Sequence, residues 1–196
     1  MDIIWILSQI EVLDQIIRSN ETIYKVIERA NLLDLEHYYI GGECITQTVW
    51  NYLSGNDLLY GINDMDFVYF DDEHLDYDAE NEVIAKIHEL FPDIGIEVDV
   101  KNEARVHLWY EHHNGFNIKP YTSLEDAINT WPTTATTIGV RLENNQFKVY
   151  APFGLNDMFG KIVKPNKVQI TKQVYENKVE KWIKQWPDLK VIPWDK

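Results

Sequence analysis

The sequence lacks several features that would place it in other protein classes. Its 196 residues include a single cysteine, Cys44, so no disulfide can form within the chain and a reducing compartment is allowed. No apolar run approaches the roughly 18 residues that a membrane-spanning helix needs. The apolar start, Ile3–Leu7, has no basic flank and is soon followed by Glu11, unlike a signal peptide. We therefore expect a cytoplasmic protein without membrane contacts.

Basic residues are scarce over most of the sequence. Residues 1–157 contain 9 Lys and Arg against 28 Asp and Glu, a net charge of −19, whereas residues 158–196 contain 9 Lys against 4 acidic residues, a net charge of +5. A protein that binds nucleic acid usually presents a broad basic face. The composition therefore disfavours nucleic acid as a partner, and it leaves the C-terminal lysines as a local source of positive charge for a triphosphate.

Apolar and aromatic residues are abundant, at 45% and 13% of the sequence, which is enough for a compact core. The sequence contains no internal repeats or low-complexity linkers, and its length suits one domain. We expect residues 1–196 to form a single domain, with a core over about 20–110 and a C-terminal elaboration over about 120–196.

Apolar periodicity and capping residues predict the secondary structure. Helices are expected over residues 2–18, 20–30, 43–53, 79–90, 123–129, 156–160 and 171–186. Strands are expected over residues 37–40, 63–70, 94–100, 137–142 and 146–150, the last two as a hairpin. The last helix is expected to bury Tyr175, Val179, Trp182, Ile183 and Trp186.

One stretch combines two features of phosphate and cation chemistry. Gly41-Gly42 follows a short apolar strand and precedes a helix, whose N-terminal N–H groups favour phosphate. Asp64 and Asp66 lie one residue apart in the next strand and project to the same face, where two carboxylates repel unless they are protonated or share a cation. Each feature alone has a simpler explanation, a tight turn or a solvated strand end. Together they indicate a metal site beside a phosphate site.

The order of strand, Gly-Gly, helix and Asp-x-Asp strand resembles the DNA polymerase beta nucleotidyltransferase superfamily. The runs Val100–Trp109 and Tyr150–Gly160 extend the resemblance over roughly residues 38–187, to a bacterial nucleotidyltransferase-like family whose acceptor is generally unassigned. The resemblance implies an α/β (α+β) nucleotidyltransferase fold, with a small mixed sheet, helices mainly on one face, and a C-terminal hairpin and helices.

The resemblance also implies a reaction. A nucleoside monophosphate would pass from an NTP to a hydroxyl of a small-molecule or protein acceptor, with release of pyrophosphate. Asp64, Asp66 and Asp99 are the expected catalytic residues, and they would bind Mg²⁺, or Mn²⁺ in its place. The residues expected to bind the nucleotide are Gly41, Gly42, Arg105, Arg141 and Lys161.

The third carboxylate of this set comes from the alternating stretch Ile94–Val100. Its apolar residues share one face, and Glu97 and Asp99 share the other. If this strand lies beside the Asp64–Asp66 strand, one of these carboxylates can complete the site. We favour Asp99, because it matches the position of the third acidic residue in the superfamily pattern.

Arg105 has two interpretations. If its stretch is extended, Arg105, His107 and Trp109 share one face and form a basic and aromatic wall that binds phosphate or stacks on the nucleotide. Alternatively, Arg105 pairs with a carboxylate inside the protein, and the two aromatic residues pack in the core.

One departure from the family pattern supports a second functional hypothesis. Relatives often carry Arg-Asn directly before Thr-Val-Trp, where this chain has Thr46-Gln47. If that arginine contacts phosphate, its absence favours a catalytically inactive, nucleotide-binding regulatory protein of the same fold.

Overall fold

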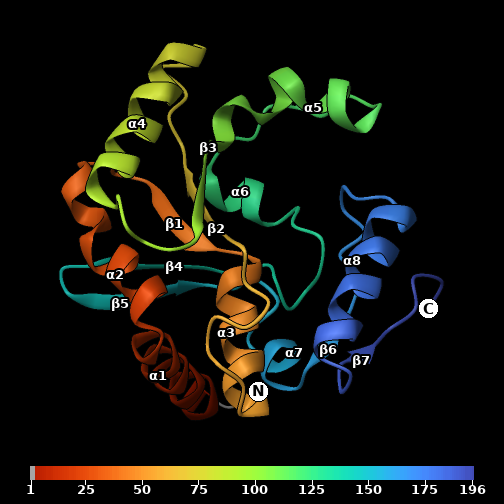
Figure 1. Ribbon diagram of the computed structural model, residues 1–196. Coiled ribbons are helices and arrows are strands. Elements are labelled where there is room, and N and C mark those ends of the chain that lie inside the picture. Colours follow the sequence, from red (N-terminus) through yellow and green to blue (C-terminus); the bar gives the residue numbers. More distant parts are fainter. Residues whose placement is uncertain (1–2) are drawn as a thin grey trace.

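The computed structural model describes the backbone of residues 3–196 and the side chains of residues 8–196. A five-stranded sheet in the order β3-β2-β1-β4-β5 lies at its centre (Figure 1). The strands are β1 Tyr38–Gly41, β2 Asp64–Tyr69, β3 Glu97–Asn102, β4 Gly139–Glu143 and β5 Gln146–Tyr150. Strands β2 and β3 are parallel and the other pairs are antiparallel, which confirms the predicted small mixed sheet.

Helices precede, separate and follow these strands along the chain, except that β4 and β5 are consecutive. The helices are α1 Ile3–Ser19, α2 Glu21–Arg29, α3 Glu43–Ser54, α4 Tyr77–Leu90, α5 Val106–Asn114, α6 Leu124–Ile128, α7 Asn156–Phe159 and α8 Lys172–Gln185, with 3-10 turns η1 Ala30–Leu33 and η2 Glu103–Arg105. A short parallel pair, β6 Ile162–Val163 with β7 Lys190–Val191, joins the C-terminal segments. The predicted caps Asn20 and Ser123 accept N–H groups at the starts of α2 and α6.

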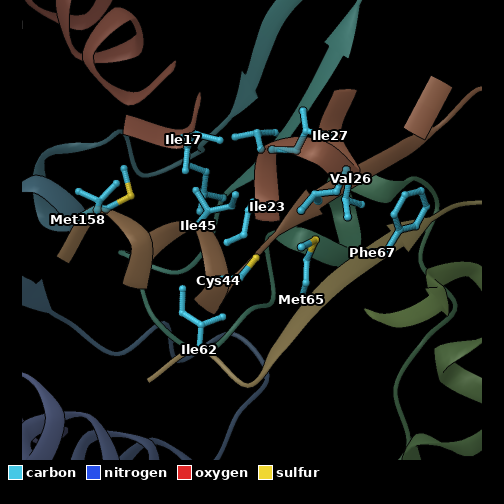
Figure 2. Close-up of a cluster of buried hydrophobic side chains, with 14 of the residues drawn as sticks. Ile17, Ile23, Val26, Ile27, Cys44, Ile45, Ile62, Met65, Phe67 and Met158 are labelled. Carbon is cyan, nitrogen blue, oxygen red and sulfur yellow. The ribbon is translucent and has the colours of Figure 1, made fainter. Parts of the chain in front are cut away.

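One face of the sheet carries the main hydrophobic core. Alternation along β1 and β2 directs Ile40, Met65 and Phe67 to this face, where they pack on apolar residues of α1–α4. Figure 2 shows Cys44 of α3 among these buried side chains. Burial raises the pKa of the Cys44 thiol well above its ordinary value, so this cysteine is a packing residue, as its position in the helix predicts.

Helix α8 extends the same core through aromatic contacts. The ring of Trp50 in α3 lies 5.7 Å from that of Trp182 and 5.5 Å from that of Trp186, in edge-to-face geometry. All three are fully buried, which confirms the packing role predicted for this helix. The prediction for Ile183 is wrong, since its side chain is 40% exposed.

Two predictions about the second half of the chain need correction. The hairpin, expected in a C-terminal elaboration, supplies strands β4 and β5 of the central sheet because β4 pairs with β1. Its turn, Asn144-Asn145, has positive φ at both residues, as a type I′ hairpin turn requires. The basic and aromatic wall around Arg105 required an extended stretch, and this stretch is instead η2 followed by α5.

The start of the third strand also differs, since β3 begins at Glu97 and not at Ile94. The apolar positions Ile3 and Leu7 of the first predicted helix lie outside the described side chains, and residue 2 lies outside the described backbone. None of the helices in the described part of the chain is long and apolar enough to cross a membrane.

Candidate active site

Strands β2 and β3 bring the predicted carboxylates together on the sheet face opposite the main core. Asp64 and Asp66 project from β2, and the parallel register places Asp66 beside Asp99 and Asp64 beside Glu97. Neighbouring strands lie about 4.8 Å apart, so side chains at paired positions are close neighbours. Asp64 is exposed, whereas Asp66 and Asp99 are half-buried. The structure therefore supports the choice of Asp99 over Glu97 as the partner of Asp66.

Asp66 lies in an unfavourable setting for a charged group. Among the described residues its carboxylate accepts no hydrogen bond. Burial raises the pKa of Asp66 to about 7; Lys101 opposes the rise, and the negative charges of Asp99, Glu43 and Asp64 add to it. A cation bound to this carboxylate would hold it ionised at neutral pH.

The glycine turn packs directly against Asp66. Gly42 has a positive φ of 72°, and a Cβ atom there would lie 2.6 Å from Asp66 Oδ2. Its N–H donates to the Ile138 carbonyl at 2.9 Å, so the prediction that this amide contacts phosphate is wrong. Gly41 is enclosed by the Ile138 carbonyl and the Trp131 ring. The turn thus allows a close approach of the backbone to Asp66.

That N-terminus is held in place by α8. The first residue of α3, Glu43, receives hydrogen bonds from Trp182 Nε1 at 3.0 Å and from Gln47 Nε2 at 2.9 Å, and Lys178 forms an ion pair with it. The helix dipole adds to the stabilisation of this carboxylate. Glu43 therefore links the C-terminal helix to the rim of the site.

Lys101 is the basic residue nearest the carboxylates. It forms an ion pair with Asp99 on the same face of β3. Burial alone would lower the pKa of Lys101, but the hydrogen bond to Asp99 and the charges of Asp66, Asp99 and Glu103 outweigh it and raise the pKa. Burial raises the pKa of Glu103 to about 7, with Lys101 opposing the rise and Asp66 and Asp99 adding to it.

A cavity of about 270 Å³ opens over this face. Gly42, Glu43 and Asp66 line one end, and Lys101 of β3 and Glu103 of η2 continue its floor. Asp64 and Asp99 are not part of its lining. The walls come from α5, from the segment 121–136 and from the C-terminal region, through residues that include Val106, Trp109, Tyr110, Tyr121, Thr130, Trp131, Gln169, Ile170 and Lys178. The volume is close to the lower end of the roughly 300–1,000 Å³ of small-ligand sites.

Arg105 does not line this cavity. Its side chain is buried, forms an ion pair with Glu80 of α4 and donates from Nε to the Leu75 carbonyl at 2.9 Å. The helical course of residues 103–114 turns it away from the cavity. The prediction of a phosphate contact is therefore wrong, and the alternative of a buried ion pair is confirmed.

The other two predicted basic residues also lie outside the cavity. Arg141 pairs with Glu143 at 2.9 Å and lies over the Tyr39 ring. Lys161 pairs with Asp188 at 2.6 Å. The structure thus places Lys101 and Lys178 at the site in place of Arg105, Arg141 and Lys161.

The carboxylates have the donor chemistry that a divalent cation needs. Among the described residues, no group of three or more His, Cys, Asp or Glu side chains is arranged to hold a metal ion by itself. Mg²⁺ usually takes only one or two carboxylates and completes its shell with substrate phosphates and water. Asp66, which has no hydrogen-bond partner among the described residues, and the exposed Asp64 fit that role.

A sheet face with paired carboxylates beside a glycine turn and a helix N-terminus has the chemistry to bind phosphate groups and a cation. A sequence model of a nucleotidyltransferase family matches residues 28–191. Because this match spans most of the chain, the protein belongs to that nucleotidyltransferase family, and nucleotidyl transfer is its general class of reaction.

The fold has a counterpart among solved structures. One described as "The NMR structure of the protein reveals a CCA-adding enzyme head domain" is similar, with a TM-score of 0.72 and 23% identity over 92% of this chain and 95% of that one. At this identity the similarity shows the fold alone. No curated protein matches the chain.

Several site residues were not identified from the sequence. Lys101 and Glu103 follow Asp99 at alternate positions, so the strand pattern carries a signal for them. Lys178 and Trp131 come from distant segments, and no local pattern indicates that they meet Asp66. Glu43 adjoins Gly42 in sequence, but its role depends on α8, which packs against it only in the folded chain.

Proposed function

We propose that this protein transfers a nucleoside monophosphate from an NTP to a hydroxyl of an acceptor in the presence of Mg²⁺ or Mn²⁺ and releases pyrophosphate. The observation that carries the proposal is Asp66, whose carboxylate lies at one end of the cavity, between Gly42 and Asp99, with its pKa raised to about 7. A carboxylate placed so supports binding of a cation and the phosphates that come with it.

The chemistry needs charge neutralisation and alignment more than covalent catalysis. The acceptor oxygen bonds to the α-phosphorus while the bond from that phosphorus to the β-phosphate oxygen breaks, and pyrophosphate leaves. Asp64 and Asp66, with Asp99, would hold the metal, which would neutralise the triphosphate and lower the pKa of the attacking hydroxyl. The N-terminus of α3, Lys101 and Lys178 supply positive charge from the protein.

Asp99 has the acceptor-side role in this proposal. It lies beside Asp66 on the outer strand of the sheet, and Lys101 holds its carboxylate in place. From there Asp99 would take the proton of the attacking hydroxyl or bind the metal on that side. Its contribution is therefore made in the transition state, and it adds little to NTP affinity.

The acceptor is a small molecule or a protein in this proposal. Residues 1–157 carry a net charge of −19, which disfavours nucleic acid as the acceptor. The fold shared with a structure described as a CCA-adding enzyme head domain supports nucleotidyl transfer in general. It does not decide the acceptor of this chain.

A second candidate is a nucleotide-binding regulator that has lost turnover. At the position where relatives often carry arginine, Thr46 is fully buried and donates to the Ala135 carbonyl at 2.8 Å. The neighbouring Gln47 is buried and donates to Glu43. Neither side chain supplies positive charge to the site, which is the observation that favours this candidate.

Pyrophosphate release separates the two candidates. Each NTP is incubated with Mg²⁺ and pooled metabolite or protein acceptors, for the wild type, Asp99→Asn and the control Glu97→Gln. We expect turnover in the wild type and the control, and a decrease of about 10² or more in Asp99→Asn with NTP affinity kept. Tight Mg²⁺-NTP binding without any release favours the regulator, and an Asp99→Asn variant as fast as wild type excludes a catalytic role for Asp99.

A further inference from the structure

The cavity has a second charged end, formed by Glu103. Glu103 lies in η2, directly after β3. It follows Asp99 and Lys101 at alternate positions, beyond the point where Lys101 lies opposite Val68 of β2 in the sheet. It lines the cavity together with Val106 of α5. The acidic floor therefore extends from Asp66 along the acceptor side of the site.

Glu103 is buried and unpaired. Its exposed fraction is 6%, and neither carboxylate oxygen accepts a hydrogen bond from a residue that the structure describes. Ionisation of a carboxylate this buried, with only the nearby charge of Lys101 to offset it, carries a free-energy cost. A ligand that brings a hydrogen-bond donor and positive charge to Glu103 would remove that cost.

The two lysines that line the cavity already form ion pairs with other residues. Lys178 pairs with Glu43, and Lys101 pairs with Asp99. Two carboxylates that line the cavity, Asp66 and Glu103, are left without an ion pair among the described residues. The proposed catalytic cation accounts for Asp66. Glu103 has only the nearby charge of Lys101, which is paired with Asp99, so a further positive charge would stabilise its ionised form.

Aromatic side chains line the cavity beside Glu103. Trp109 and Tyr110 come from α5, which follows η2; burial raises the pKa of Tyr121, and the nearby charge of Glu103 adds to the rise. Trp131 packs on Gly41 and Gly42 at the other end. The Tyr121 hydroxyl is held by Gln169 at 2.8 Å, which fixes the position of its ring. Aromatic faces attract ammonium groups, and more strongly where water is excluded.

We propose that the Glu103 end of the cavity binds a protonated amine, and that the acceptor is a small molecule carrying both this amine and the reacting hydroxyl. The identification as acceptor rests on the proposed transfer reaction; the amine site itself rests on Glu103 and the aromatic walls. A cavity of about 270 Å³ suits a small molecule and not a folded protein chain. A nucleobase offers neutral N–H donors, which would satisfy the hydrogen bonds of Glu103 but leave its charge.

Ligand-observed NMR with matched pairs tests the amine site. Linear amino alcohols from ethanolamine to aminohexanol are each compared with the diol that carries a hydroxyl in place of the amine, in the presence of Mg²⁺ and a non-hydrolysable NTP. We expect the wild type to prefer an amino alcohol over its diol by at least about 10-fold. Glu103→Gln should remove that preference, and Glu111→Gln, the same change at an exposed site on α5, should keep it.

Equal binding of amine and diol, or no binding of either, overturns the proposal. So does an effect of Glu103→Gln on NTP selection alone, which would assign Glu103 to the base. The comparison in the wild type decides the matter even if the variant does not fold. Pyrophosphate release is measured in parallel samples in which the natural NTP replaces the analogue. Amine binding without release supports the amine site and contradicts the proposed transfer reaction, and release without amine preference supports the transfer reaction and contradicts the amine site.

Discussion

The two faces of the central sheet differ in what their side chains do. On β2, Phe67 points into the main core and is fully buried against Tyr38, whose ring lies 5.5 Å away. Its neighbour Asp66 points the other way, to a cavity where it has no hydrogen-bond partner among the described residues. Adjacent residues of one strand therefore serve stability and chemistry separately. Substitutions on the two faces should have opposite consequences.

The largest expected effect on stability is on the core face. Phe67→Ala removes a fully buried ring and leaves a cavity, so we expect a loss of about 3–5 kcal/mol in the free energy of unfolding. Phe153, which is 45% exposed, provides the control, and Phe153→Ala should change stability by less than about 1 kcal/mol. Urea denaturation measures both. Similar losses for the two variants would mean that the core is not where the fold places it.

On the opposite face, Asp66→Asn should abolish turnover and increase stability. The pKa of Asp66 is raised from 3.8 to about 7, so the wild type loses stability as pH rises through that window, and the loss is complete above it. The variant lacks this loss. We therefore expect it to gain about 1–3 kcal/mol over the wild type above pH 7, and nothing below pH 4.

Thermal unfolding without metal, across pH 4 to 8, measures the stability gain, and pyrophosphate release measures the loss of turnover, expected at about 10² or more. A difference in stability that is constant over this range would show that Asp66 is not buried as a charged group. Retained turnover would place the chemistry elsewhere.

The glycine turn connects the two faces and should show a smaller effect. Gly42→Ala places an alanine at a position of positive φ and puts its Cβ 2.6 Å from Asp66 Oδ2. We expect a loss of about 1–2 kcal/mol in the free energy of unfolding and a decrease of about 10-fold or more in turnover. Gly95 has a φ of 82° and nothing within 4 Å of its Cβ position. Gly95→Ala should lose similar stability and keep full turnover. Equal turnover in the two variants would contradict the close approach of Gly42 to Asp66.

The smallest expected effect concerns nucleic acid. With a net charge of −19 over residues 1–157, we expect no shift of duplex DNA in a gel at about 0.15 M salt. The same assay with single-stranded RNA extends the test to a second polymer. Tight, salt-sensitive binding of either would replace the small-molecule acceptor with a nucleic acid.

The core face could be predicted from the sequence because its signals are local. Helical spacing located α2 and α8, and alternation located β2 with Asp64 and Asp66 on one face. The hairpin β4–β5 was found from its turn residues, but its place in the sheet was not. Pairing of β4 with β1 joins segments about 100 residues apart, and no local pattern specifies such a partner.

The site face was less predictable because it is assembled from distant segments. The strand pattern placed Asp64 and Asp66 on one face and left Glu97 or Asp99 as the third carboxylate, and the choice of Asp99 came from the family resemblance. The parallel pairing of β2 and β3 places Asp99 beside Asp66. The basic residues were misassigned, because whether an arginine or lysine reaches a site depends on the acid nearest to it in the fold. Arg105 illustrates this, since Glu80 of α4 pairs with it inside the protein.

Calorimetry of NTP binding with and without Mg²⁺ tests the central claim most directly. A non-hydrolysable NTP is titrated into the wild type, Asp64→Asn and the control Glu97→Gln, whose exposed side chain adjoins Asp64 in the sheet. The account predicts that Mg²⁺ strengthens binding in the wild type and the control, because carboxylate and phosphate share the ion, and that Asp64→Asn loses this gain. An equal gain from Mg²⁺ in all three proteins would contradict it.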